Sequence, residues 1–109
     1  MTTQTQEAIE LCIFKLAPGA DAAEFEASNK EVNEWVNQQP GFMFRCLSQK
    51  EDGTWMDIVH WDSMASAQQA GDAFIKELGG SQFMKLIDQD SVSMNHGYVK
   101  HAAPAQAAA

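Results

Sequence analysis

The chain has 109 residues, 45% hydrophobic and 20% charged, a mixture typical of one globular domain with a single core. Fifteen acidic residues against seven basic ones give a formal charge of −8, which disfavours binding to nucleic acids or anionic membranes. No apolar run approaches the roughly 20 residues that span a bilayer, and residues 1–7 lack the pattern of a secretion signal. We therefore expect a cytoplasmic protein whose partners include neither nucleic acid nor membrane.

Cysteine usage points to the same compartment. Cys12 and Cys46 are far apart in the sequence, and neither belongs to a Cys-x-x-Cys motif. The pattern predicts two free, half-buried thiols in a reducing environment rather than a disulfide, redox motif or zinc site.

The first predicted element is a strand over residues 7–16. Ile9, Leu11 and Ile13 form one apolar face, and the alternate positions 8, 10, 12 and 14 form a mixed second face. Two largely apolar faces indicate a strand that is covered on both sides.

Two amphipathic helices are predicted. The first begins after Asp21 as N-cap and extends to about residue 38, with an inner stripe of Phe25, Val32, Trp35 and Val36. The second begins after Ser63 and covers about 64–78, with an inner stripe of Ala67, Ala70, Phe74 and Leu78. A short helical turn is expected at 82–87.

Strands are predicted at 42–50 and 54–62, joined by a tight turn at Asp52-Gly53. If Glu51 faces Thr54 across a two-residue turn, the pairing propagates outward. The expected pairs are then Ser48 with Asp57, Cys46 with Val59, Phe44 with Trp61, Leu47 with Ile58, and Arg45 with His60.

A last strand is expected at 91–99, followed by an Ala-rich tail over 101–109. The complete order is βαββαβ, which predicts an α+β, ferredoxin-like domain over 1–100: a four-stranded antiparallel sheet with both helices on one face. The opposite face is also apolar, so we expect a homodimer in which a second copy covers it.

These residues resemble the dimeric α/β-barrel superfamily, in particular its antibiotic-biosynthesis-monooxygenase-like members. The similarity spans residues 7–99. It is carried by Phe14-Lys15-Leu16 with Pro18-Gly19, by Gln39-Pro40-Gly41-Phe42, and above all by Asp57-Ile58-Val59-His60-Trp61-Asp62-Ser63, a strand that ends in Trp and enters an Ala-rich helix.

The resemblance implies a homodimer whose sheets face each other, with an apolar pocket in each subunit. Its members include cofactor-free monooxygenases of quinols and polyphenols, haem-degrading enzymes, and proteins without known activity. Haem-degrading members use an Asn on the first strand and a Trp and a His near the second helix. Here the first strand has no Asn, Phe74 stands near the Trp position, and residues 62–95 contain no His. The haem reading is therefore disfavoured, and no cofactor is expected.

Three residues are candidates for catalysis. The expected register makes His60 and Arg45 neighbours, so Arg45 could hold a substrate oxyanion while His60 accepts a phenolic proton; the alternative is an ordinary polar cross-strand pair. Asp57 lies two positions from Trp55 and four from Trp61, where aromatic surroundings would favour a carboxyl that acts as base. The alternative for Asp57 is a hydrogen bond to Ser48.

Four further residues are expected to contact a substrate: Trp61, Phe44, Phe74 and His96. For Trp61 the alternative is a core position, and for His96 a hydrogen-bonded place on an apolar face. The histidines at 60, 96 and 101 lack the spacing of metal ligands, so no metal is expected.

The sequence thus favours a cofactor-independent monooxygenase that oxidises a small aromatic or quinol-type molecule with dioxygen in an apolar pocket. The alternatives are a non-catalytic homodimer that binds or senses a hydrophobic metabolite, and a purely structural dimer. A cavity of roughly 300 Å³ or more would separate the first two from the third.

Overall fold

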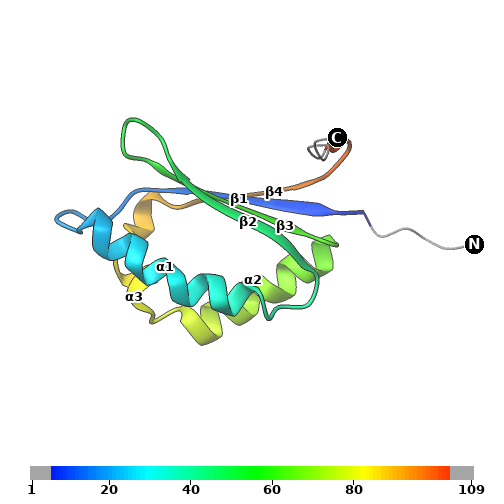
Figure 1. Ribbon diagram of the computed structural model, residues 1–109, viewed down its shortest axis with the longest axis horizontal. Helices are drawn as coiled ribbons and strands as arrows, with labels where there is room; N and C mark the ends of the chain where they lie inside the picture. Colours follow the sequence, from blue (N-terminus) through cyan, green and yellow to red (C-terminus); the bar gives the residue numbers. More distant parts are fainter. Residues whose placement is uncertain (1–5, 104–109) are drawn as a thin grey trace, which may run out of the picture.

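A computed structural model describes residues 6–103 of the chain. Four strands form one antiparallel sheet in the order β2-β3-β1-β4: β1 Ala8–Phe14, β2 Phe42–Gln49, β3 Trp55–Trp61 and β4 Ser93–Tyr98. The helices α1 Ala22–Val36, α2 Met64–Leu78 and α3 Gln82–Lys85 all lie on one face of the sheet, with a 3-10 turn η1 at Gln89–Ser91 before β4 (Figure 1). The predicted ferredoxin-like α+β fold is confirmed. The expected tail at 101–109 falls mostly outside the described residues.

Local signals set the helix boundaries as predicted. The Asp21 carboxylate accepts a hydrogen bond from the Ala23 amide at the start of α1, and the Ser63 hydroxyl accepts one from the Ser66 amide at the start of α2. Both caps satisfy backbone N–H groups that a helix leaves free in its first turn. None of the helices in the described part of the chain is long and apolar enough to cross a membrane.

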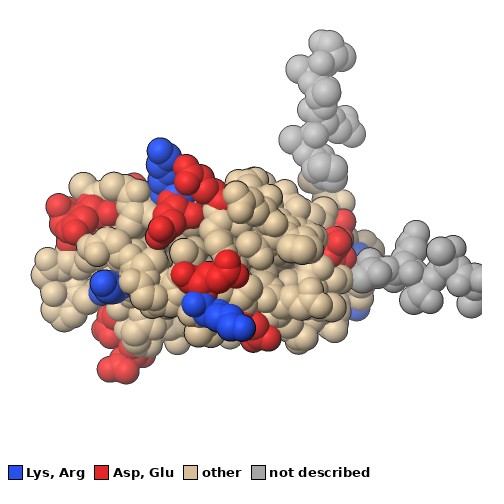
Figure 2. Space-filling model, turned by 90° about the horizontal axis from the view of Figure 1, so that it is seen from below, with Lys and Arg blue, Asp and Glu red and all other residues tan. Residues whose placement is uncertain are grey.

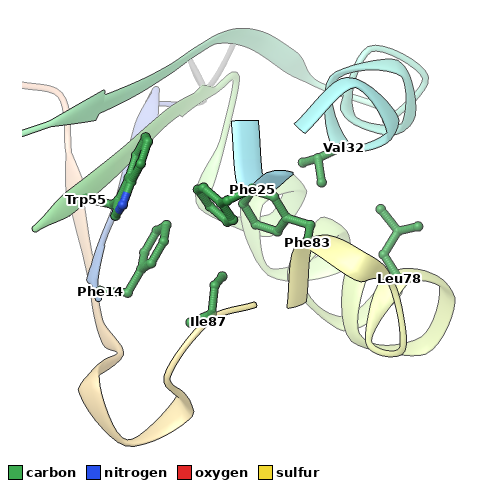
Figure 3. Packing of buried hydrophobic residues seen from close by; sticks show 7 residues of the cluster. All are labelled: Phe14, Phe25, Val32, Trp55, Leu78, Phe83 and Ile87. Carbon is green, nitrogen blue, oxygen red and sulfur yellow. The ribbon is translucent and has the colours of Figure 1, made fainter. Parts of the chain in front are cut away.

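The core lies between the sheet and the helices. Figure 3 shows its larger cluster, in which the Phe25 ring meets Phe14, Trp55 and Phe83 with centroid distances of 5.7, 4.9 and 4.6 Å. A second cluster surrounds Trp61 at the other end of the helix layer. Most of the predicted inner stripes are buried, while Trp35 and Phe74 are half-buried. These aromatic contacts anchor α1 and α3 to the sheet.

The register of the β2–β3 hairpin differs from the prediction by one residue. The Lys50 amide donates to the Thr54 carbonyl at 2.7 Å, so the loop has three residues, Glu51-Asp52-Gly53, and not two. Gly53 has φ +92°, and the Asp52 carboxylate accepts from the Thr54 amide at 2.9 Å. A three-residue loop that ends in a left-handed glycine is a common hairpin connection.

The shifted register changes which side chains meet. The observed pairs include Leu47 with Asp57, Cys46 with Ile58, Arg45 with Val59, and Phe44 with His60. All five expected pairs, among them Arg45 with His60 and Ser48 with Asp57, are therefore wrong. A bulge between Phe42 and Phe44 then lets Phe42, rather than Phe44, pair with Trp61. A one-residue slip exchanges the two faces of a strand, so Arg45 and His60 lie on opposite faces of the sheet.

The face of the sheet away from the helices is left open by the described chain (Figure 1). Ile9, Leu11 and Ile13 of β1 lie on this face, as the alternation predicted, with Phe44 and His60 beside them. The Phe44 side chain is 55% exposed. Cys46 is exposed here and not half-buried as expected, whereas Cys12 on the helix face is half-buried, and both thiols are free.

Candidate functional site

A cavity of about 520 Å³ lies between the sheet and the helix layer. Its walls are largely apolar and come from α1, α2, α3 and the helix-facing side of the sheet. Four polar side chains interrupt the sheet wall: Glu10, Arg45, Asp57 and His96. The volume lies in the range of small-molecule sites and exceeds the value that separates a ligand cavity from a filled interior.

The sequence-predicted residues divide between the two faces of the sheet. Five of them line the cavity: Arg45, Asp57, Trp61, Phe74 and His96. The other two, His60 and Phe44, pack against each other on the open face, with ring centroids 5.8 Å apart. The predicted partnership of His60 with Arg45 therefore does not form.

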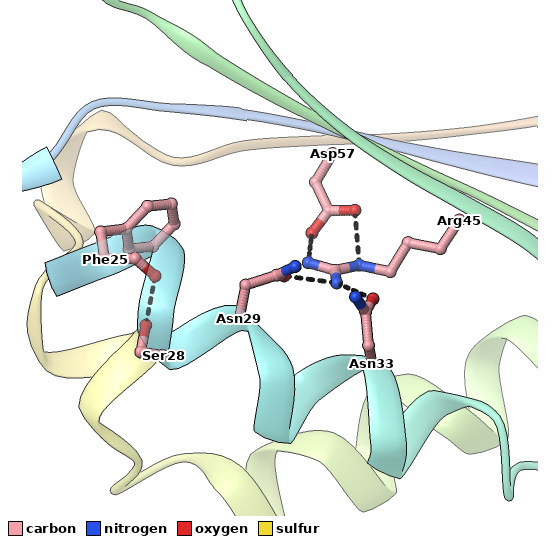
Figure 4. Close-up of polar contacts among 6 residues, drawn as sticks. All are labelled: Phe25, Ser28, Asn29, Asn33, Arg45 and Asp57. Carbon is pink, nitrogen blue, oxygen red and sulfur yellow. Dashed lines mark hydrogen bonds and ion pairs between the residues drawn. The ribbon is translucent and has the colours of Figure 1, made fainter. Parts of the chain in front are cut away.

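Arg45 is the centre of a polar group that also contains Asp57, Asn29 and Asn33; we call it the Arg45 cluster. Figure 4 shows the guanidinium held between the Asp57 carboxylate and two amides of α1. Its Nε donates to Asp57 Oδ1 at 3.0 Å and its Nη2 to Oδ2 at 2.7 Å, a bidentate pair. Nη1 donates to the side-chain oxygens of Asn29 and Asn33 at 2.6 and 2.7 Å.

This arrangement limits what the two charged groups can do. The side chains of Arg45 and Asp57 are only 4% and 14% exposed. Both carboxylate oxygens accept from the guanidinium, and four of the five guanidinium N–H groups are used within the cluster. The Arg45 cluster therefore ties β2, β3 and α1 together and fixes one wall of the cavity.

Glu10 is the centre of a second group, with Trp61 and His96; we call it the Glu10 cluster. The Trp61 indole Nε1 donates to Glu10 Oε1 at 2.8 Å, and His96 Nε2 lies 3.0 Å from Glu10 Oε2. An ionised carboxylate can only accept, so with Glu10 ionised Nε2 is the donor, and in that tautomer of the neutral imidazole Nδ1 holds the lone pair. No hydrogen bond to Nδ1 is found within residues 6–103.

Strand register brings the Glu10 cluster together. Glu10 pairs with Val59 of β3 and with His96 of β4, so Glu10 and His96 share the helix-facing side. Trp61 lies two positions beyond Val59, diagonally opposite Glu10 on that same face. The Glu10 side chain is 13% exposed and that of His96 34%, which places the imidazole on the accessible side of the pair.

Cys12 lies between the two clusters on the same wall. Burial raises the pKa of its thiol to about 11, and the negative charges of Asp57 and Glu10 add to the effect. The thiol is therefore neutral at ordinary pH and adds no anionic nucleophile to the site. Three or more potential metal ligands do not gather anywhere in the described chain.

Sequence reasoning missed Glu10, Asn29 and Asn33. Each carried a signal: Glu10 is a carboxylate on the strand face that also holds Phe14, and Asn29 and Asn33 are four residues apart and so share a helix face. A polar group among buried positions needs a partner, but the partners come from other strands and were not visible in the sequence.

Comparison with known proteins extends the picture. The chain matches no family model and no curated protein by sequence. Several solved structures share its fold. SnoaB from Streptomyces nogalater, a cofactor-independent oxygenase solved as a mutant, aligns with a TM-score of 0.73 and 17% identity over 93% of this chain and all of its own.

Two other solved structures align similarly. MhuD from Mycobacterium tuberculosis, a heme-degrader solved with two hemes in its active site, gives a TM-score of 0.72 and 18% identity over 89% of this chain and 99% of its own. PA3566 from Pseudomonas aeruginosa gives a TM-score of 0.70 and 14% identity over 92% of this chain and all of its own. The predicted resemblance is confirmed at the level of fold: the chain shares the ferredoxin-like α+β fold of these solved structures.

Proposed function

We propose that the chain is a cofactor-independent oxygenase that oxidises a small aromatic or quinol-type molecule with dioxygen in the cavity between sheet and helices. One observation carries the proposal: an apolar cavity of about 520 Å³ contains a histidine whose one ring nitrogen is held by a buried carboxylate. The fold shared with SnoaB supports the same reading.

The proposed proton acceptor is His96. Glu10 holds Nε2–H, which directs the Nδ1 lone pair away from the carboxylate and stabilises the imidazolium once a proton is taken. Trp61 donates to the other Glu10 oxygen and so fixes the carboxylate. This assignment replaces His60 and Asp57 as the base, because His60 lies on the opposite face and Asp57 is occupied by Arg45.

The chemistry needs no bound cofactor if the substrate supplies the electrons. Removal of a proton from a phenol or an activated ring C–H gives an electron-rich anion that reduces dioxygen. One oxygen atom then becomes the carbonyl of a quinone, and the other leaves as water. The water takes both hydrogens of the oxidised CH2 of an anthrone, or the phenolic hydrogen and the single hydrogen of the oxidised ring carbon of a phenol. Apolar residues such as Phe74 and Trp61 would hold the flat ring and keep water away.

Oxygen uptake with candidate anthrones and quinols tests the proposal. We expect turnover that survives chelators, together with one ¹⁸O atom from ¹⁸O₂ in the product. His96→Asn should lower kcat by roughly 10²–10⁴, the usual contribution of a general base. The matched variant His60→Asn removes the histidine on the other face of the sheet.

The outcomes separate the alternatives. If His60→Asn loses as much activity as His96→Asn, the reaction takes place on the open face and our assignment is wrong. If bound ligand is found but no compound is oxidised, the chain is a binding protein for a hydrophobic metabolite, the second interpretation.

We also propose a homodimer formed through the open face. Ile9, Leu11, Met43 and Phe44 gather there, and Met43 and Phe44 are 50% and 55% exposed. Native mass spectrometry should show two chains, and Phe44→Glu, which places a charge at that face, should give monomers. A monomeric parent protein would contradict this proposal without affecting the cavity.

A further inference from the structure

The ionisable side chains that line the cavity are unevenly balanced. Three are carboxylates, Glu10, Asp57 and Asp72, while Arg45 is the one lysine or arginine that lines it in the described chain. On the face of the helix layer in Figure 2, acidic and basic side chains are interspersed without a continuous basic patch. The excess of negative charge at the cavity is therefore not offset by a ring of cations on that face.

The single cation is not available to a ligand. The Arg45 guanidinium neutralises Asp57 through the bidentate pair at 2.7 and 3.0 Å and is 4% exposed. Its Nη1 is already taken by Asn29 and Asn33. With four of its five N–H groups engaged, the guanidinium offers a ligand carboxylate, sulfonate or phosphate at most one N–H, on a side chain whose charge is already neutralised by Asp57.

Glu10 has no such partner. Its two contacts are the uncharged indole of Trp61 and the imidazole of His96, and its side chain is 13% exposed. Because Asp72 also lies on the wall, the formal charge around the cavity is negative whichever protonation state His96 adopts. Asp72 is exposed, but the Glu10 side chain is 13% exposed, so beside Glu10 an added anion would be screened less by water and repelled more strongly than at the surface.

The pKa of Cys12 reflects the same carboxylates. Burial is the first cause of its raised pKa of about 11, and the charges of Asp57 and Glu10 are the next two. The same two carboxylates that oppose a thiolate at this wall would oppose a negatively charged ligand beside it.

We infer that the cavity selects uncharged hydroxylated aromatic molecules and excludes their carboxylated, sulfonated or phosphorylated counterparts. The inference rests on the proposed function only in taking the cavity as the substrate site. It does not require that the bound molecule be oxidised. A neutral phenol can donate to Glu10 or His96, whereas an anion meets the charge of the Glu10 carboxylate and a guanidinium that is already paired with Asp57.

Three naphthalene probes test the charge preference at pH 7: 6-hydroxy-2-naphthoate, its methyl ester and 2-naphthol. Equilibrium dialysis gives each Kd. We expect the ester and 2-naphthol to bind similarly and the carboxylate to bind at least about tenfold more weakly than the ester, which is about 1.4 kcal/mol. The ester is the larger molecule, so this comparison separates charge from size. Equal affinity of acid and ester would overturn the inference.

Two variants test whether the Glu10 carboxylate is the charge that weakens binding of the acid. Glu10→Gln keeps an oxygen that can accept a hydrogen bond from Trp61. In this variant the acid-to-ester ratio, the Kd of the carboxylate divided by the Kd of its methyl ester, should fall close to one. Glu34→Gln removes the same charge from an exposed pair with Lys30 outside the cavity, and the ratio should stay as in the parent. If Glu34→Gln narrows the ratio as much as Glu10→Gln, net charge explains the effect and the inference is wrong.

Cys12 serves as a second reporter that needs no substrate. Iodoacetamide and iodoacetate are similar in size and differ in charge, and mass spectrometry separates alkylation at Cys12 from alkylation at the exposed Cys46. We expect the amide-to-acid rate ratio at Cys12 to exceed that at Cys46 at least about fivefold, since the local field opposes the anionic reagent. Equal ratios would overturn the inference. Selective binding without oxygen uptake would instead remove only the proposed oxygenase function.

Discussion

Arg45→Ala is expected to be among the most destabilising single changes in this chain. The substitution leaves the Asp57 carboxylate, 14% exposed, without the guanidinium that now meets both of its oxygens. Breaking a buried ion pair by removing one partner typically lowers the free energy of unfolding by about 3–5 kcal/mol. Asn29 and Asn33 lie on α1, where Asn33 is exposed and water can replace the lost donor at that amide. We therefore expect a loss of about 3 kcal/mol, at the lower end of this range.

Urea unfolding, followed by tryptophan fluorescence at one protein concentration, measures this loss. Lys30→Ala is the matched control, because it breaks a pair of 3.9 Å whose side chains are 84% and 66% exposed. Exposed pairs between helix residues i and i+4 contribute about 0.5 kcal/mol or less. An Arg45→Ala loss below about 1 kcal/mol, close to the control, would refute the buried-pair argument.

A double variant separates charge from packing. In Arg45→Met with Asp57→Leu, neither charge remains to be desolvated, and apolar replacement of a buried pair is often neutral or stabilising. We expect this variant to recover at least half of the loss seen in Arg45→Ala. If it is less stable than Arg45→Ala, the lost hydrogen bonds to α1 dominate and not the uncompensated carboxylate.

Two further predictions concern other parts of the chain. Gly41 has φ +83°, and a Cβ there would collide with the side chains of Asp62 and Ser66. Gly41→Ala should therefore lower the free energy of unfolding by at least about 2 kcal/mol in the same urea assay. Gly53 has φ +92° with open space around it, so Gly53→Ala should lower that free energy by only about 1 kcal/mol. Equal losses would show that the collision is relieved. Because the Cys12 thiol has a pKa of about 11 against a model value of 9.0, its alkylation by iodoacetamide should still rise with pH above about 10, where the thiol of the urea-unfolded chain levels off. The folded chain holds this proton more tightly than the unfolded chain, so the thiol's contribution to stability should fall as pH rises from about 9 to 11. Coinciding alkylation profiles for folded and unfolded protein would contradict both statements.

The sequence was sufficient for those features that local patterns determine. The caps at Asp21 and Ser63 and the inner stripe of Phe25, Val32 and Val36 follow from residues within a few positions of each other. The two-faced pattern of β1 correctly indicated an open apolar face. These signals depend on helix and strand periodicity and do not require knowledge of tertiary partners.

The site was less predictable, because its geometry depends on pairings between distant strands. The choice of Arg45, Asp57, Trp61, Phe74 and His96 placed five residues at the cavity. The predicted pairs of Arg45 with His60 and of Asp57 with Ser48 did not form. Asp52-Gly53 suits a two-residue turn and also the end of a three-residue loop. The hydrogen bond from the Lys50 amide to Thr54 decides between them, and composition alone does not predict it.

The third residue of the hairpin loop changes which charged side chains meet at the cavity. In the predicted register Arg45 would have faced His60, leaving Asp57 as a carboxylate among aromatic rings. In the observed register Arg45 points to the helix layer and neutralises Asp57, so the carboxylate with uncharged or titratable partners is Glu10. The hairpin geometry thus removes Asp57 as a candidate base, whereas the pairing of β1 with β4 places Glu10 beside His96. A variant that restored a two-residue loop and kept β2 paired would turn Arg45 away from the cavity and leave Asp57 without its cation, so the exclusion of anions should become stronger.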